Sequence, residues 1–329
     1  MLRFLFRRFV WFVITLSVVM GVSFVLMRSV KGGPFDQDRK LEPAIERNIR
    51  QKYNLDDPML IQFLDYVGPL NMGDDGWFGE GEDKGKRPWG GVLTGDFGPS
   101  FRYRDFTVNQ ILAQSLPISA LLGVVSMMWA LALGISTGIA SALWRGSRID
   151  LALRLAATCG IALPNFVIAG FLIIMFVFML PLFPVAGWGS IRHMMLPGFC
   201  LGLVYAAYIS RLTRTGMLEA LSQDHIRTAH AKGLAPATVI MRHALKGGLL
   251  PVVSYLGPAT AGILTGSLVI ERIFGIPGTG SHFINSATNR DYTLAMGVTI
   301  LYTVLVYGFN TVVDLAYTLL DPRIELEDS

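Results

Sequence analysis

The chain has 329 residues, of which 52% are hydrophobic and only 16% are charged. Soluble domains usually carry about 25% charged residues, so the composition excludes an ordinary soluble protein and indicates a membrane protein with several spans. The formal net charge is only +4, so the placement of the basic residues matters more than their sum. Cys159 and Cys200 both fall in apolar segments, which favours buried thiols over a disulfide framework or a metal site.

The first apolar run covers residues 9–27 and follows a basic segment, 1–8. A helix of about 20 residues crosses a ~30 Å hydrocarbon core, so the run predicts a membrane span. The alternative is a cleaved signal peptide. The run is long for such a peptide and no A-x-A-like cleavage site follows, which favours an uncleaved span. Arg3, Arg7 and Arg8 then predict a cytoplasmic N-terminus.

Residues 31–107 form a polar segment with fourteen acidic and eleven basic side chains. Long segments can be exported regardless of their charge, so we expect an external insertion after the first span. Stretches 41–55 and 57–70 predict two short amphipathic helices. The stretch 72–91 is rich in Gly, Asp and Trp and predicts an irregular insertion. Its acids lack the D-x-[DN]-x-[DN]-G pattern, which favours a solvated loop over a calcium site.

Five further apolar stretches follow, at 116–143, 150–180, 195–213, 249–270 and 293–319. Together with the first run they predict six spans, which places both termini in the cytoplasm. Basic residues concentrate in the loops that this topology leaves inside, namely Arg145, Arg148, Arg211, Arg214, Arg227, Lys232, Arg242 and Lys246. The last exported loop sets Glu271 beside Arg272 and Arg290 beside Asp291, and the one before it has only Arg192.

The expected fold class is therefore an all-α polytopic membrane protein. Residues 1–30 form the N-terminal tail and first span, residues 31–107 form the external insertion, and residues 108–329 form a five-helix core. That core carries a cytoplasmic loop at 214–248.

Polar groups inside the predicted spans are few. Asp314 is the acid that the sequence places within a span, with Asn310 one turn earlier on the same face. An intramembrane acid is a candidate for a gate. Asp314 lies near the predicted cytoplasmic end of its span, which favours a structural hydrogen bond. Glycines such as Gly134 and Gly262 permit close packing or bending, and ordinary helix packing explains them equally well.

The polar, basic stretch between the fourth and fifth apolar runs is longer than a connecting loop requires. Gly233 followed by Pro236 predicts a helix stop and restart, so this stretch has room for two short helices and a turn. We interpret it as a docking surface for another protein, in which Arg227 and Lys232 pair with acids and Leu234 is an apolar anchor. The alternative is a loop that lies on anionic lipid headgroups.

Several catalytic motifs are absent from the sequence. It contains no G-x-x-x-x-G-K-[ST] nucleotide loop, no H-E-x-x-H and no G-x-S-x-G. His225 and His230 are five residues apart, a spacing that does not favour a metal site. A transporter with this sequence therefore takes its energy from a partner, and the basic loop is the natural point of input. An ion-gradient-driven secondary transporter is the main alternative. A membrane enzyme or a scaffold without transport are the others.

The loop sequence IRTAHAKGL, followed by RHALKGGLLPVV, resembles the EAA-type coupling loop of ABC importer permeases of the oligopeptide, dipeptide and nickel group. Residues 7–35, 94–112, 266–280 and 289–324 are similar to the same group, so the resemblance covers nearly the whole chain. Two departures stand out. Arg-Thr-Ala replaces the Glu-Ala-Ala of the short consensus, and the insertion at 71–92 is longer than is typical.

The resemblance implies a heterodimer with a second permease subunit in the lipid bilayer of the bacterial inner membrane, each subunit forming half of the pathway. It implies two cytoplasmic ATPase subunits that bind ATP and Mg, an extracytoplasmic binding protein that delivers peptide, no cofactor in this chain and no nucleic acid. It also narrows the ATPase contact to residues 222–234. The stretch RHALKGGLLP, residues 242–251, then connects this contact to the fifth span. The contact residues are Ser222, Asp224, His225, Ile226, Arg227, Thr228, Ala229, Ala231, Lys232, Gly233 and Leu234. Neither the exact cargo nor the residues lining the pathway follow from the sequence.

Overall fold

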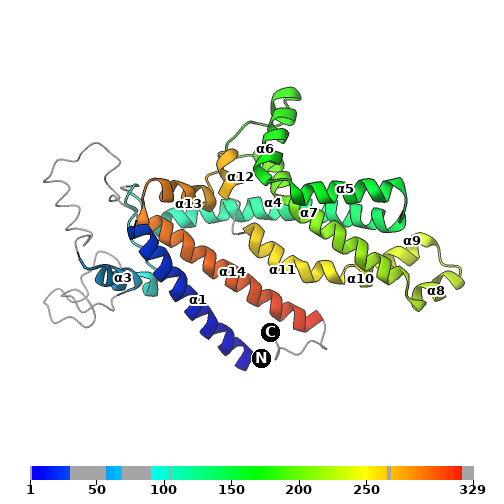
Figure 1. Ribbon diagram of the computed structural model, residues 1–329, viewed down its shortest axis with the longest axis horizontal. Helices are drawn as coiled ribbons and strands as arrows, with labels where there is room; N and C mark the ends of the chain where they lie inside the picture. Colours follow the sequence, from blue (N-terminus) through cyan, green and yellow to red (C-terminus); the bar gives the residue numbers. More distant parts are fainter. Residues whose placement is uncertain (1, 30–56, 69–89, 104, 265–267, 321–329) are drawn as a thin grey trace. The chain divides into compact units, whose positions relative to one another are not determined.

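The computed structural model describes residues 2–29, 57–68, 90–103, 105–264 and 268–320, and these residues are predominantly helical (Figure 1). The α-helices are α1 (Leu2–Ser29), α3 (Met59–Val67), α4 (Val108–Leu143), α5 (Arg148–Ala162), α6 (Asn165–Ile173), α7 (Ile191–Leu221), α8 (Asp224–Ala231), α9 (Pro236–Thr238), α10 (Leu245–Gly248), α11 (Leu250–Leu264), α12 (Leu268–Ile273), α13 (Thr279–Thr288) and α14 (Tyr292–Leu320). A 3-10 turn, η1 (Val92–Thr94), and two π-helical segments, η2 (Ile174–Met179) and η3 (Val239–Ala244), complete the described elements.

Helix α3 confirms the second of the two short helices expected in the external insertion. The first of them, at 41–55, and most of the insertion at 71–92 lie outside the described residues.

Four helices of the described chain, α1, α4, α7 and α14, are long and apolar enough to cross a membrane. The expected third span, 150–180, is not one straight helix, because α5 and the α6–η2 helix meet at a bend of 108°. Pro164 explains the break, since a residue that precedes proline is pushed out of the helical region, and Leu163 is extended. Counting this bent pair gives up to five candidate spans.

The expected fifth span, 249–270, is described in two parts. Helix α11 reaches Leu264 and α12 starts at Leu268, and residues 265–267 lie outside the described residues. The apolar part of α11 is shorter than the candidate spans. The described residues therefore form an all-helical membrane protein with four or five candidate spans, and the six-span topology stays a prediction.

The chain divides into two compact units, which we describe separately. Unit one consists of residues 1–117 and 281–304. Within it, Met20 and Phe24 of α1 form a buried cluster with Tyr66 of α3 and with Met296 and Ile300 of α14. Few other residues of α1 are covered: only 11% of its most apolar window is buried within the structure.

A buried carboxylate joins two distant stretches of unit one. Asp291 caps the start of α14 by accepting the backbone N–H of Leu294 at 3.2 Å. It also accepts the backbone N–H of Phe101 at 3.1 Å and the hydroxyl of Ser100. Thr293 adds a hydrogen bond to the carbonyl of Pro99 at 2.7 Å. The stretch before α4 is thereby fastened to the first turn of α14.

Unit two consists of residues 118–280 and 305–329. Helices α4 and α7 cross in it so closely that a Cβ on Gly138 would lie 2.5 Å from the Cβ of Thr213. A Cβ on Gly202 would lie 2.4 Å from the carbonyl oxygen of Ser126. Small residues in these helices therefore serve close packing, as is usual between helices in lipid.

A second buried carboxylate organises the end of unit two at α12 and α13. Glu271 of α12 is completely buried and accepts the hydroxyl of Ser119 of α4 at 2.8 Å. The same Ser119 oxygen accepts the backbone N–H of Thr279 at 2.9 Å. The charge that the sequence placed in an exported loop thus lies in the core, where it holds the α12–α13 connection against α4.

Candidate functional site

Helix α8 carries the predicted contact surface and is attached to unit two through one face. Ile226 is 2% exposed and Ala229 is also buried, and residues three apart share a helical face. They pack in a cluster with Met217 and Ala220 of α7, together with Ala142, Val239 and Ala244. Figure 1 shows α8 beyond the end of α7, beside α9. Local amphipathicity thus orients α8 with its polar face outward.

The predicted contact residues divide into two groups. Ile226 and Ala229 point inward and pack against the rest of unit two, and their expected contact with a partner stays a prediction. The others are exposed: Ser222, Asp224, His225, Arg227, Thr228, Ala231, Lys232, Gly233 and Leu234. Arg227 pairs with Asp224 at 3.4 Å on this outer face. The outer surface is therefore charged and polar, with Leu234 as its apolar member.

The end of α8 confirms the predicted stop at Gly233. This residue has φ of 76°, a left-handed conformation that glycine adopts without penalty. Its N–H donates to His230 O at 2.9 Å, and the N–H of Leu234 donates to Ala229 O at 3.3 Å, a pattern that satisfies the last carbonyls of a helix. Pro236 then begins α9, where its fixed φ and missing N–H suit the first helical turn.

The boundaries of the loop differ from the prediction. Helix α7 continues to Leu221, past the expected loop start at Arg214, because Met217 and Ala220 on its last turns pack under α8. On the other side, η3 and α10 lead almost directly into α11, as predicted for RHALKGGLLP. The two helices that flank α8 in the chain, α7 and α10, touch each other, because a Cβ on Gly216 would lie 2.2 Å from Gly248 O.

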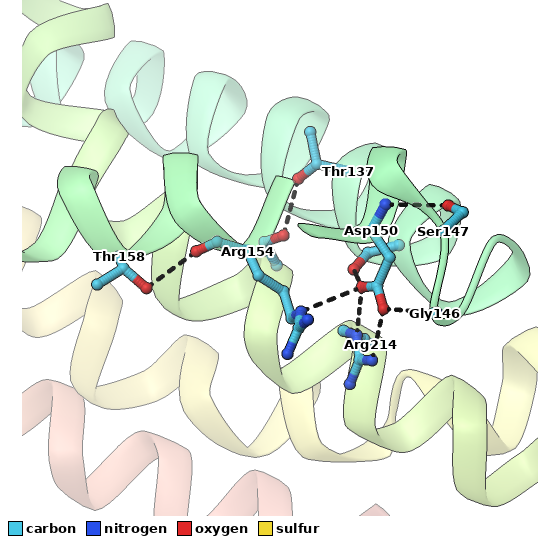
Figure 2. A network of polar contacts seen from close by, with 9 residues as sticks. Thr137, Gly146, Ser147, Asp150, Arg154, Thr158 and Arg214 are labelled. Carbon is cyan, nitrogen blue, oxygen red and sulfur yellow. Dashed lines mark hydrogen bonds and ion pairs between the residues drawn. The ribbon is translucent and has the colours of Figure 1, made fainter. Parts of the chain in front are cut away.

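A buried ion pair lies behind this surface, in α5 and α7 (Figure 2). Asp150 of α5 is 1% exposed, and Arg214 of α7 is 21% exposed. The guanidinium Nε and Nη2 donate to the two carboxylate oxygens at 2.9 and 3.0 Å, the two-pronged geometry that makes such pairs strong. Arg154 approaches the same carboxylate at 3.5 Å but is half in solvent.

The turn from α4 to α5 closes on the same carboxylate. Ser141 of α4 donates its hydroxyl to Asp150 at 2.5 Å, and Gly146 donates its N–H at 3.0 Å. Ser147 caps α5 by accepting the N–H of Asp150 at 3.2 Å. One side chain therefore joins α4, the turn, α5 and α7.

Residues 134–326 match the family described as binding-protein-dependent transport system inner membrane component, and residues 1–123 match the N-terminal part of such membrane components. The chain belongs to this family of transport permeases. Family membership confirms the predicted resemblance to ABC importer permeases. It also confirms the prediction that the chain is a transport subunit and not itself an ATPase, and it implies ATPase and binding-protein partners.

Named relatives and a solved structure agree with this assignment. The permease is 42% identical over 326 residues to the oligopeptide transport system permease protein OppB of Salmonella typhimurium, covering 98% of this chain and 99% of the relative. It is 40% identical to the dipeptide transport system permease protein DppB of Bacillus subtilis, covering 99% of both. An inward-facing MetNI methionine ABC transporter matches in fold, with a TM-score of 0.51 and 16% identity over 65% of this chain and 97% of that one.

Sequence reasoning missed the buried carboxylates of the permease. It singled out Asp314, which is half-buried on α14 together with Asn310, and their role as a gate stays a prediction. Asp150 and Glu271 are the acids that the structure buries in unit two. One local signal was present for Asp150, because Ser147-x-x-Asp150 before an apolar run is a capping-box pattern. Its partner Arg214 is 64 positions away, and no local pattern specifies it.

Proposed function

We propose that this permease is one of two membrane subunits of an ATP-driven importer and forms half of a pathway for peptides. The supporting observation is full-length likeness at 40–42% identity to permeases named for oligopeptide and dipeptide transport. An extracytoplasmic binding protein delivers the peptide. The sequence has no nucleotide loop of its own, so two cytoplasmic ATPase subunits bind ATP and Mg and perform the hydrolysis.

Helix α8 is the proposed contact with an ATPase subunit. Its inner face is committed to unit two through Ile226 and Ala229, and its outer face presents the exposed charges of Asp224, Arg227 and Lys232. An element fixed on one side and open on the other can move as a rigid lever. ATP changes the state of the pathway only if it binds one of two states better than the other.

The proposed topology has six spans. The bent α5–α6–η2 pair counts as the third, and α11 with α12 counts as the fifth. Both termini then lie on the cytoplasmic side of a bacterial inner membrane, and α8 lies on the same side. A homologous second permease completes the pathway.

The proposal is tested by reconstituting the permease with its second permease, ATPases and binding protein in proteoliposomes. We expect uptake of radiolabelled tri-alanine that requires ATP and the binding protein. A photo-crosslinking side chain introduced at Lys232 should capture an ATPase subunit.

Two results would overturn the proposal. Uptake by this chain alone, abolished by an uncoupler and insensitive to ATP depletion, would identify a secondary transporter. Crosslinking of position 232 to lipid alone would assign α8 to headgroups.

A further inference from the structure

Three tyrosines gather where α7 and α11 face each other in unit two. Tyr205 and Tyr208 lie in the central third of α7, and Tyr255 lies in the central third of α11. The ring centroids of Tyr208 and Tyr255 are 5.8 Å apart. A Cβ on Gly262 of α11 would lie 2.8 Å from the Tyr205 hydroxyl. The cluster is therefore built by both helices, and its shape depends on a glycine at its edge.

The hydroxyl groups of these three tyrosines have no hydrogen-bond partner among the described residues. Tyr208 is 40% exposed, and Tyr205 and Tyr255 are half-buried. One turn further along α7, Arg211 is exposed and has no ion-pair partner among those same residues. We call these four side chains the tyrosine face.

Contact with the hydrocarbon chains of lipid would be unfavourable for the tyrosine face. A hydroxyl without a hydrogen bond in an apolar medium costs several kcal/mol, and a charged side chain within a span is expensive and usually faces water or protein. Tyrosine in membrane proteins concentrates at the interfaces, where its tip is wet. Helix α1 shows the contrasting pattern, because its outward residues are apolar, such as Val18 and Val22.

We propose that the tyrosine face lines the translocation pathway and binds the backbone of the transported peptide. Each phenol hydroxyl can donate to a peptide carbonyl and accept from a peptide N–H. The guanidinium of Arg211 can take a terminal carboxylate through paired hydrogen bonds.

Such contacts use groups that every peptide has, and the aromatic rings offer apolar surface to varied side chains. The inference rests on the proposed function, because it assumes peptide as the cargo.

The side of the cluster at α11 favours a ligand over a second protein surface. Gly262 is exposed and has no side chain to cover the neighbouring Tyr205 hydroxyl. Three free hydroxyls and a charge at an open position match the alternating donors and acceptors of an extended peptide. Contact with the second permease subunit and contact with lipid are the competing outcomes that the following experiments separate.

The first experiment measures water access in the reconstituted complex. Tyr208→Cys is compared with Val18→Cys, which is 59% exposed on α1, both in a Cys159→Ser background. We expect a water-soluble, membrane-impermeant thiol reagent to label position 208 in at least one nucleotide state, and tri-alanine with its binding protein to slow that labelling. Position 18 should stay unlabelled. A position 208 that resists the reagent in every state, or that crosslinks to the second permease, would overturn the inference.

The second experiment removes one hydroxyl and keeps the ring. A hydrogen bond contributes about 0.5–1.5 kcal/mol, so Tyr208→Phe and Tyr255→Phe should each lower the tri-alanine uptake rate by roughly 2- to 10-fold. ATP hydrolysis stimulated by the binding protein should continue, which shows that the complex is assembled. Arg211→Gln should reduce uptake, and Arg211→Lys, which keeps the charge without the paired hydrogen bonds, should restore only part of it. Tyr66→Phe is the matched control, because it removes a buried hydroxyl of unit one.

The two levels of the proposal fail differently. If the wild-type complex does not import tri-alanine, the proposed function and this inference both fall. If wild-type import and the α8 crosslink hold while both Phe variants keep their uptake rates within twofold, only the tyrosine face is refuted.

Discussion

Two aspartate–arginine pairs in unit two are built in opposite ways. Asp150 and Arg214 are 1% and 21% exposed and are joined by two hydrogen bonds. Asp224 and Arg227 of α8 are 94% and 77% exposed and make a single contact at 3.4 Å. Breaking a buried pair leaves an uncompensated charge, whereas exposed pairs contribute little. The first pair joins α5 to α7, and the second lies on the exposed face of α8, where its charges are accessible.

The largest loss of stability should follow from Asp150→Ala. The substitution leaves Arg214, the Ser141 hydroxyl and the Gly146 N–H without their shared acceptor, so we expect the thermal midpoint of the detergent-solubilised permease to fall by roughly 10 °C. Arg154→Gln is the control, because Arg154 touches the same carboxylate from a half-exposed position and should change the midpoint little. Equal midpoints for Asp150→Ala and wild type would contradict a structural role for the buried pair.

Ile226→Ala should have the next largest effect. It removes the main buried contact between α8 and the rest of unit two, and we expect a fall of roughly 5 °C in the thermal midpoint together with weaker ATPase copurification. Leu234→Ala, at an exposed position, should weaken copurification with little change in the midpoint. If both variants behaved alike, α8 would not have an attached face and a free one.

Gly233→Ala should cost about 1–2 kcal/mol, because a side chain disfavours the left-handed conformation. No atom lies within 4 Å of the position that a Cβ would take, so the cost comes from the backbone alone. Gly170→Ala is the control, since Gly170 has the same open space but lies inside α6 without a positive φ. Chemical denaturation of both variants measures the difference. A stable Gly233→Ala would show that α8 can end without this turn.

The smallest effect on stability should come from neutralising the outer pair. Asp224→Asn and Arg227→Gln should each shift the thermal midpoint by less than about 1 °C. Both should reduce ATPase copurification if the outer face of α8 is the docking surface. Normal copurification with both variants would move the contact to other residues of α8.

Local patterns in the sequence were enough for much of the fold. Long apolar runs predicted α1, α4, α7 and α14, and the Gly233–Pro236 pair predicted the end of α8 and the start of α9. These features depend on residues close together in the chain, where hydrophobicity and backbone preference decide the structure. The family resemblance came from stretches spread over nearly the whole chain.

Features set by tertiary contacts were not predictable in the same way. Hydropathy is averaged over a window, so residues 150–180 were predicted as one span and the bend at Pro164 was not detected. The inward turn of Ile226 depends on Met217 and Ala142, which come from other helices. The partners of Asp150, Glu271 and Asp291 lie 64, 152 and up to 191 positions away. A single sequence carries no record of such distant pairs.

The contact between Gly216 and Gly248 gives the α8 excursion a closed base. Backbone meets backbone there, with no room for a methyl group, and closely packed interiors transmit strain instead of absorbing it. The segments that lead into and out of α8 therefore meet where their backbones cannot move closer together. We expect a displacement of α8 toward this contact to act on α7 and α11 together, and hence on both of the helices that carry the three tyrosines.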